Sequence, residues 1–247
     1  MIARVVRLTV WLGLGAALLS GVYWLFLSTP ETNALALGAS VVLLLLLLVL
    51  TALVVNAAVL IGGGANVGVS IARGLRGTLW FIVTLIPLGM AWWGLTAGQA
   101  WVVEHSGEIN AWFIARFGWA DISALMTAEA WAVRWLGWVV VPLAAVSLLA
   151  ALLHDGARGV GGPWLRRAWH WRTLAMATIV FVLFFVLPWR LTTWRPAVPP
   201  TWVEPTVAGL RLFAAVLLWS FGAALLVLLS VSGRAVAPPT AVAAEQP

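Results

Sequence analysis

The residue types that could support acid–base or metal chemistry are few, and the densest group lies near the middle of the chain. Glu104 and Glu108 would share one face of a helix at the i, i+4 spacing, with His105 beside them. Carboxylates and an imidazole placed together can transfer protons or bind a metal ion. Ser106 and Gly107 disfavour a stable helix at this point, so solvated loop charges are the preferred interpretation.

Two further histidines, His154 and His170, flank the segment 154–172 and are the candidate cofactor ligands. Imidazoles on neighbouring helices can ligate a haem or a pigment. Both residues, however, lie at the edges of apolar segments and not within them. The sequence contains no cysteine, so thiolate metal sites are excluded. We therefore predict no catalytic residue, no metal site and no bound cofactor, and we expect that the protein is not an enzyme.

The elements that would position these groups are six long apolar segments without a single Asp, Glu, Lys, Arg or His. Each reaches the length of roughly 17–25 residues with which a helix crosses a hydrocarbon core of about 30 Å. Residues are 63% hydrophobic and 9% charged, with a mean hydropathy of +1.04, whereas soluble domains carry roughly 25% charged residues. The segments are Leu8–Ser28, Ala34–Gly62, Gly77–Gly98, Trp135–Leu153, Thr173–Trp189 and Leu212–Gly233.

This pattern predicts an all-α membrane protein, a bundle of six transmembrane helices in one domain over residues 1–234. The predicted spans, including flanking residues, are 8–28, 34–62, 77–98, 131–153, 172–190 and 208–233. Between spans 3 and 4, an apolar face at i, i+3, i+4 and i+8 predicts a periplasmic interfacial helix, with Ile109, Trp112, Phe113 and Phe117 on that face. Residues 235–247 are Ala- and Pro-rich, which predicts a disordered cytoplasmic tail.

The arginines predict the orientation, because cytoplasmic loops carry an excess of basic residues. All fourteen basic residues are arginine. With the N-terminus inside, nine arginines and two acidic residues lie inside, whereas five arginines and six acidic residues lie outside. We expect a multi-pass protein of a bacterial inner membrane with both termini cytoplasmic. The net charge of +6 is spread over loops beside the membrane, which suits anionic lipids and does not imply nucleic acid.

The two long cytoplasmic loops, 62–76 and 154–172, resemble each other. Each is a glycine-rich turn followed by basic residues, which include Arg73, Arg76, Arg158, Arg166 and Arg167. One interpretation is a pair of flexible connections whose arginines contact lipid head groups. The other is a docking surface for a cytoplasmic partner, and we favour the first because charged loops beside membranes are general.

Tryptophan is abundant, with 18 residues, and twelve of them fall toward the predicted outer face. Indole rings favour membrane interfaces because the ring is apolar and its N–H needs a partner. The outer excess would also suit contacts with other membrane subunits, or a site for an aromatic, isoprenoid or sugar group. The candidate contacts in the outer loop are Trp112, Phe113 and Trp119.

Small and polar residues within the spans predict helix contacts. Gly13, Ala17 and Gly21 are spaced by four in the first span, which allows close approach of another helix, internal or from a partner. Asn56 is the most polar residue within a span and is best interpreted as a helix–helix hydrogen bond. Pro87, Pro142 and Pro188 can kink spans 3 to 5 and either open a cavity or serve packing.

Three hypotheses for function remain after this survey. The first is a non-catalytic subunit or assembly component of a larger bacterial inner-membrane complex, with other membrane subunits and anionic lipids as partners. The second is a transport component that binds an apolar or amphipathic small molecule or lipid. The third is a membrane enzyme acting on a lipid-linked substrate, with Arg190, Arg195 and Glu204 at the outer edge. Proton relays and ion coupling are disfavoured, because the interiors of the spans carry no ionisable group.

Overall fold

The computed structural model describes residues 2–29, 33–118, 122–162, 169–193 and 203–231, and these residues are predominantly helical. The labels η1 and η3 denote π-helical turns, and η2 denotes a 3-10 turn. In chain order the elements are α1 (Ile2–Ser28), α2 (Ala34–Gly62), α3 (Val67–Arg76), α4 (Thr78–Glu104), α5 (Ser106–Phe117), α6 (Ser123–Trp135), η1 (Leu136–Val140), α7 (Val141–Asp155), η2 (Gly156–Gly161), α9 (Trp171–Phe181), η3 (Val182–Val186), α10 (Leu187–Thr193) and α11 (Val203–Val231).

Six helices of the described residues are long and apolar enough to cross a membrane, which confirms the prediction of an all-helical protein with six candidate spans. The second coincides with its predicted span, and the fourth is longer, running over Ser123–Gly161 where 131–153 was predicted. A separate helix, α5, lies between the third and fourth. Ser106 and Gly107 do not prevent it: α4 ends at Glu104, His105 makes the turn, and α5 begins at Ser106.

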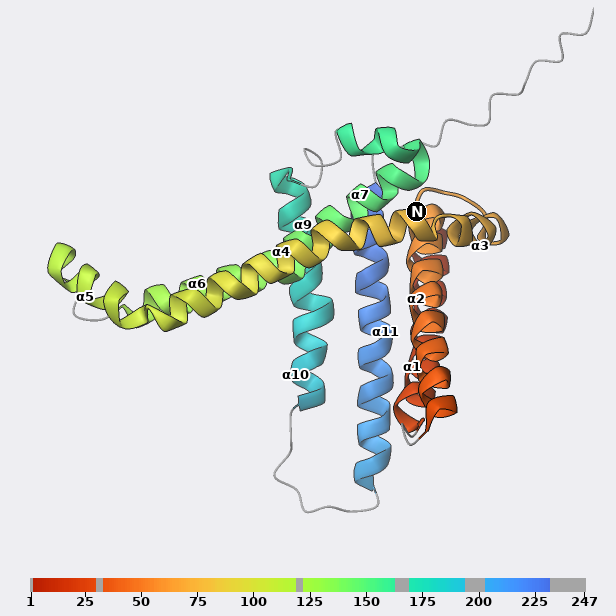
Figure 1. Ribbon diagram of the computed structural model, residues 1–247, viewed down its shortest axis with the longest axis horizontal. Helices are drawn as coiled ribbons and strands as arrows, with labels where there is room; N and C mark the ends of the chain where they lie inside the picture. The colour runs from red at the N-terminus through yellow and green to blue at the C-terminus, as the bar shows by residue number, and fades with distance from the viewer. Residues whose placement is uncertain (1, 30–32, 119–121, 163–168, 194–202, 232–247) are drawn as a thin grey trace, which may run out of the picture.

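The six long helices form a group of four that is crossed by a hairpin of two (Figure 1). In the group of four, α1 packs against α2 and α11, and α11 packs against α10 and η3. The hairpin consists of α4 and the continuous helix α6–η1–α7, and Figure 1 shows α4 running across the direction of α1, α2 and α11. The sequence pattern led us to expect one bundle of six helices. In the structure the helices do not share one bundle axis.

The crossing follows from how α3 and the start of α4 pack on α2. A Cβ on Gly74 would lie 3.3 Å from the backbone nitrogen of Ala57, so the missing side chain lets α3 approach α2 this closely. Asn56 then donates from Nδ2 to the carbonyl oxygen of Gly74 at 2.9 Å. Next along the chain, a Cβ on Gly77 would lie 2.5 Å from Cδ2 of Leu153, which brings α7 against the same point.

The core lies at this crossing and along one end of α2. A first cluster joins α2, α4, α7 and α11, and contains Ala52, Val59, Phe81, Leu149, Ala150 and Val231. A second joins α1, α2 and α11, and contains Leu8, Ala58, Ile61, Ala224 and Val227. The last turns of α2, Asn56–Gly62, are buried at every position, as expected for a helix that is apolar on all sides and surrounded by other helices.

Each of the two π-helical turns ends two residues before a proline. Proline has no N–H, so it leaves the carbonyl four residues earlier without its helical partner. For Pro142 and Pro188 these carbonyls belong to Trp138 and Phe184, which lie within η1 and η3. A local π turn is one of the adjustments that accommodates freed backbone groups in membrane helices. Pro87, by contrast, lies inside α4 without such a turn.

Candidate interaction surfaces

The two glycine-rich loops that the sequence analysis compared, 62–76 and 154–172, meet in the structure at their first residues. A Cβ on Gly63, at the end of α2, would lie 3.4 Å from Nε2 of His154, at the end of α7. A Cβ on Gly64 would lie 3.3 Å from a guanidinium nitrogen of Arg4. Gly64 has φ +100°, a conformation that favours glycine. The glycine turn after α2 is thus covered by α1 on one side and α7 on the other.

The arginines of this region are on the surface. Arg73 and Arg76, in the last turn of α3, and Arg158, in η2, have exposed side chains. Arg166 and Arg167 lie outside the described residues.

The two candidate histidine ligands occupy different surroundings. His154 faces the glycine turn after α2, whereas the ring of His170 lies 6.4 Å from that of Trp171 in a stacked arrangement. The earlier His105 stacks on Trp101 at 4.6 Å, and its Nδ1 lies 2.9 Å from the carbonyl oxygen of Trp101. Over the ranges that the structure describes, no three His, Cys, Asp or Glu residues are grouped as a metal site requires.

Three tryptophans act as contacts between helices, which the interface interpretation missed. The indole N–H of Trp11 donates to the carbonyl of Val54 at 2.9 Å, from α1 to α2. Trp135 donates to the hydroxyl of Thr178 at 2.8 Å, from α6 to α9. The third, Trp219, donates from α11 to a carbonyl in η3. The position of Trp219 in the middle of the last apolar segment, away from a membrane interface, was the signal in the sequence for a contact between helices.

Of the small residues spaced by four in α1, Gly13, Ala17 and Gly21, only the first packs against another helix in the part of the chain that the structure describes. A Cβ on Gly13 would lie 3.6 Å from Oγ of Ser220 in α11, so Gly13 faces a neighbouring helix. Ala17 and Gly21 are exposed, and a Cβ on Gly21 would meet no atom within 4 Å. Gly15, which is outside this set, packs tightly on α2 instead, since a Cβ there would lie 2.6 Å from Val54.

The distal part of the hairpin forms an exposed arm, which we define as Leu85–Phe117 together with α6. Neither α5 nor α6 contains a buried residue, and in α4 only Phe81 and Thr84, before the arm, are buried. Its large apolar side chains are open, with Trp93 73% exposed and Trp112 57% exposed. Figure 1 shows α5 at the end of the hairpin, away from the group of four helices.

Aromatic residues of the arm pack on one another. Trp112, Phe113 and Phe117 form a cluster with ring centroids 5.0 to 5.6 Å apart. At the base of the arm, Trp92 of α4 meets Trp138 of η1 edge to face at 5.5 Å. Trp119, which was predicted to contribute to this surface, lies outside the described residues.

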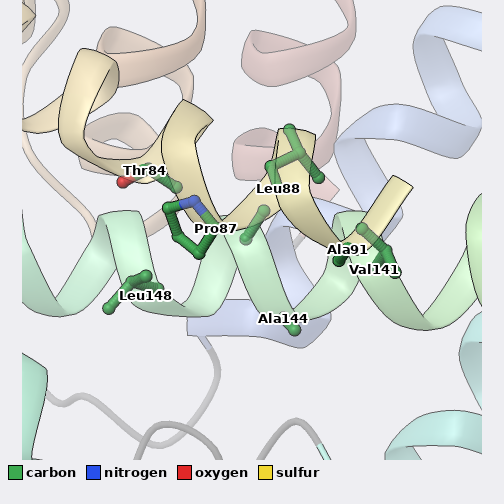
Figure 2. Close-up of a pocket in the computed structure, with 8 residues that line it drawn as sticks. Thr84, Pro87, Leu88, Ala91, Val141, Ala144 and Leu148 are labelled. Atoms are coloured by element: carbon green, nitrogen blue, oxygen red, sulfur yellow. The ribbon is translucent and has the colours of Figure 1, made fainter. Parts of the chain in front are cut away.

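An apolar gap lies between α4 and α7 and is lined by side chains of both helices (Figure 2). It has a volume of about 100 Å³ and is partly open to the surroundings. Its walls are Thr84, Pro87, Leu88 and Ala91 from α4, and Val141, Ala144, Ala145 and Leu148 from α7. Both helices thus turn small or apolar side chains toward the gap.

Buried polar atoms occur nearby on α2 and α7. Asn56 and Ser147 are 0% and 4% exposed. Within the described residues, Asn56 Oδ1 and Ser147 Oγ have no hydrogen-bond partner. Asn56 thus makes the predicted helix–helix hydrogen bond through its amide N–H, while its carbonyl oxygen has no partner among the described residues.

Comparison with known proteins gives no relative from which a function could be transferred. No protein-family model, no curated protein and no solved structure matches the chain. The surfaces described above are therefore the basis for assigning a role.

Proposed function

We propose that the protein is a non-catalytic subunit or assembly component of a larger complex in a bacterial inner membrane. The observation that carries this proposal is the exposed arm. It consists of long apolar helices with no buried residue in α5 or α6, yet it is rich in large aromatic side chains. Tryptophan is among the residues that contribute most to protein–protein contacts.

The composition of α4 is that of a membrane-embedded helix and not of a helix that rests on the membrane surface. A helix that rests on a membrane surface has one apolar and one polar face. In α4, the uncharged stretch before Glu104 shows no such division, because apolar residues surround the axis. Such a helix, extended across the direction of α1, α2 and α11 (Figure 1), is well suited to pack against membrane helices of another subunit.

The proposed orientation places both termini in the cytoplasm and α5 in the periplasm, at the outer surface of the membrane. The arginine distribution supports this orientation. The cytoplasmic loops 62–76 and 154–172, which meet at Gly63 and His154, would then offer a second contact surface for a cytoplasmic partner or for anionic lipids.

Purification of the tagged full-length chain from its native membranes in a mild detergent tests the proposal. We expect a particle of defined stoichiometry with at least one other membrane protein. Trp93→Ala combined with Trp112→Ala should remove that partner. The matched control is Trp24→Ala, since Trp24 is 71% exposed but lies on α1. A chain that is isolated alone from native membranes, at every detergent concentration that keeps it folded, would overturn the proposal.

A further inference from the structure

We propose that the base of the arm is a hinge, at which α4 bends at Pro87 and the helix beside it bends at the π turn before Pro142. The arm swings there as one unit against the group formed by α1, α2, α10 and α11. This hinge belongs to the chain itself and does not depend on the complex proposed above. Two interrupted helices, the packing on either side of the interruptions and the unfilled gap between them support it.

The backbone of both helices is interrupted at the base of the arm. Pro87 has no N–H, so the carbonyl of Val83 lacks its helical donor. Pro142 has the same effect on the carbonyl of Trp138, where the helix changes to the π turn η1. The two interruptions face each other, since Pro87 and Val141 line the same gap. Prolines and π turns are among the few causes of sharp bends in helices, so both helices bend most easily at this point.

On the core side of the two prolines, the helices of the hairpin are anchored. A Cβ on Gly77 would lie 2.5 Å from Cδ2 of Leu153, which fixes the start of α4 on the end of α7. Phe81 of α4 is buried in the cluster that also contains Leu149 and Ala150 of α7. This part of the hairpin therefore belongs to the core and forms the fixed side of the hinge.

On the other side of the prolines, the two helices are joined to each other. A Cβ on Gly137 would lie 2.9 Å from the ring of Trp92, and this ring meets that of Trp138 edge to face at 5.5 Å. Beyond this contact, α5 and α6 contain no buried residue. Within the described residues the arm is thus tied across its base but is not packed into the core.

The gap gives the two helices room to bend. Its lining residues lie at 84–91 in α4 and at 141–148 in α7, between the anchored contact and the tied contact in both helices. Close-packed interiors resist displacement because they leave no void to move into. Here a volume of about 100 Å³ is unfilled, and Pro87 and Val141 face it (Figure 2). A bend at Pro87 can therefore change the separation of the helices without a clash between them.

The hinge changes the direction of the arm and leaves its length unchanged. From Pro87 to Val103 the helix runs about 24 Å, so a change in bend of about 20° moves its tip by about 8 Å. The remainder of α4 up to Glu104 is a continuous helix without a second proline. The bend is therefore concentrated at Pro87, and α5 moves with the tip.

Distances between two nitroxide labels, measured by pulsed electron paramagnetic resonance on the purified full-length protein in lipid nanodiscs, test the hinge. The chain contains no cysteine, so the exposed positions Val103→Cys on α4 and Leu210→Cys on α11 can be labelled. The reference pair is Val6→Cys on α1 with Leu210→Cys, both within the group of four helices. We expect the distance distribution of the arm pair to be broader than that of the reference pair by about 8 Å. Equal widths for the two pairs would overturn the proposal.

Matched variants locate the bend. Pro87→Ala with Pro142→Ala restores both N–H groups and should narrow the distribution of the arm pair about twofold. Ala144→Leu fills the gap from α7 and should narrow it as well, and Ala91→Leu fills it from α4 in case the first variant fails to fold. The control is Pro188→Ala, since Pro188 also follows a π turn but lies in α10, outside the hairpin. A width that neither the proline pair nor a filled gap reduces, or that Pro188→Ala reduces equally, would contradict a hinge at the base of the arm.

Discussion

The indole N–H of Trp219 donates to the backbone carbonyl of Phe185 at 3.4 Å, inside the π turn that precedes Pro188. Three residues further along α11, a Cβ on Gly222 would lie 2.5 Å from Cβ of Phe184. One face of α11 therefore both approaches the irregular turn and supplies a hydrogen-bond donor to it. This contact explains a tryptophan in the middle of an apolar helix.

Trp219→Phe should destabilise the protein by about 1–2 kcal/mol, because it removes the donor to a π-turn carbonyl and leaves space beside η3. The midpoint of thermal unfolding in detergent, followed by circular dichroism, should fall by several degrees. Trp93→Phe is the matched control, since Trp93 is 73% exposed, and its midpoint should stay within error of the natural protein. Equal midpoints for both variants would contradict the role of Trp219.

Asn56→Leu should weaken the junction of α2, α3 and α4 by about 1–2 kcal/mol, because it leaves the Gly74 carbonyl without the amide donor. Unfolding in increasing SDS measures the change. Asn110→Leu is the control. Asn110 lies in α5, and its Oδ1 is a buried atom with no hydrogen-bond partner among the described residues. If Asn56→Leu proves as stable as this control, the hydrogen bond to Gly74 makes no net contribution to the free energy of unfolding.

Gly15→Val should destabilise the contact between α1 and α2 by about 1–3 kcal/mol, because the added carbons would overlap Val54. Gly21→Val, where the space around the Cβ position is open, should leave the protein as stable or more stable. Combining Gly15→Val with Val54→Ala should restore part of the loss. The same SDS titration applies, and a loss that is no smaller in the double variant would refute the direct contact.

The orientation can be tested with single cysteines, because the chain contains none. Ala115→Cys on α5 should react with a membrane-impermeant maleimide in intact cells whose outer membrane has been permeabilised. Ala157→Cys, in the loop after α7, should react only after the inner membrane is lysed. Both positions are exposed. The opposite pattern would reverse the proposed orientation, and protection of both positions until lysis would mean that the α4–α7 hairpin does not reach the periplasm.

The helices were predictable from the sequence because uninterrupted apolar segments have few structural alternatives in a membrane. The crossing of α4 over α2 was not, because both helices are apolar all round and their composition marks no face for a neighbour. Gly74 and Gly77 determine it, yet they appear in the sequence only as members of a glycine-rich, basic segment.

For the candidate surfaces, too, the sequence predicted the types of residue involved better than it predicted which of them contact another helix. The exposure of Trp112 agrees with its predicted place on an interfacial helix, whereas Trp11 and Trp135, near the ends of apolar segments where interface rings are expected, are interhelical donors. Equally, a spacing of four picked out Gly13 in α1, but the closest approach to α2 occurs at Gly15. Spacing within a helix shows which residues share a face, and it does not show which face meets another helix.

The arm gives the protein a long lateral reach. From Leu85, just after the last buried residue of α4, to Glu104 the helix extends about 30 Å, roughly the width of a small folded domain. A partner that binds α5 therefore need not touch the group formed by α1, α2, α10 and α11. If one protein binds α5 and another binds the opposite end of α4, the rigidity of a single helix would set the spacing between them.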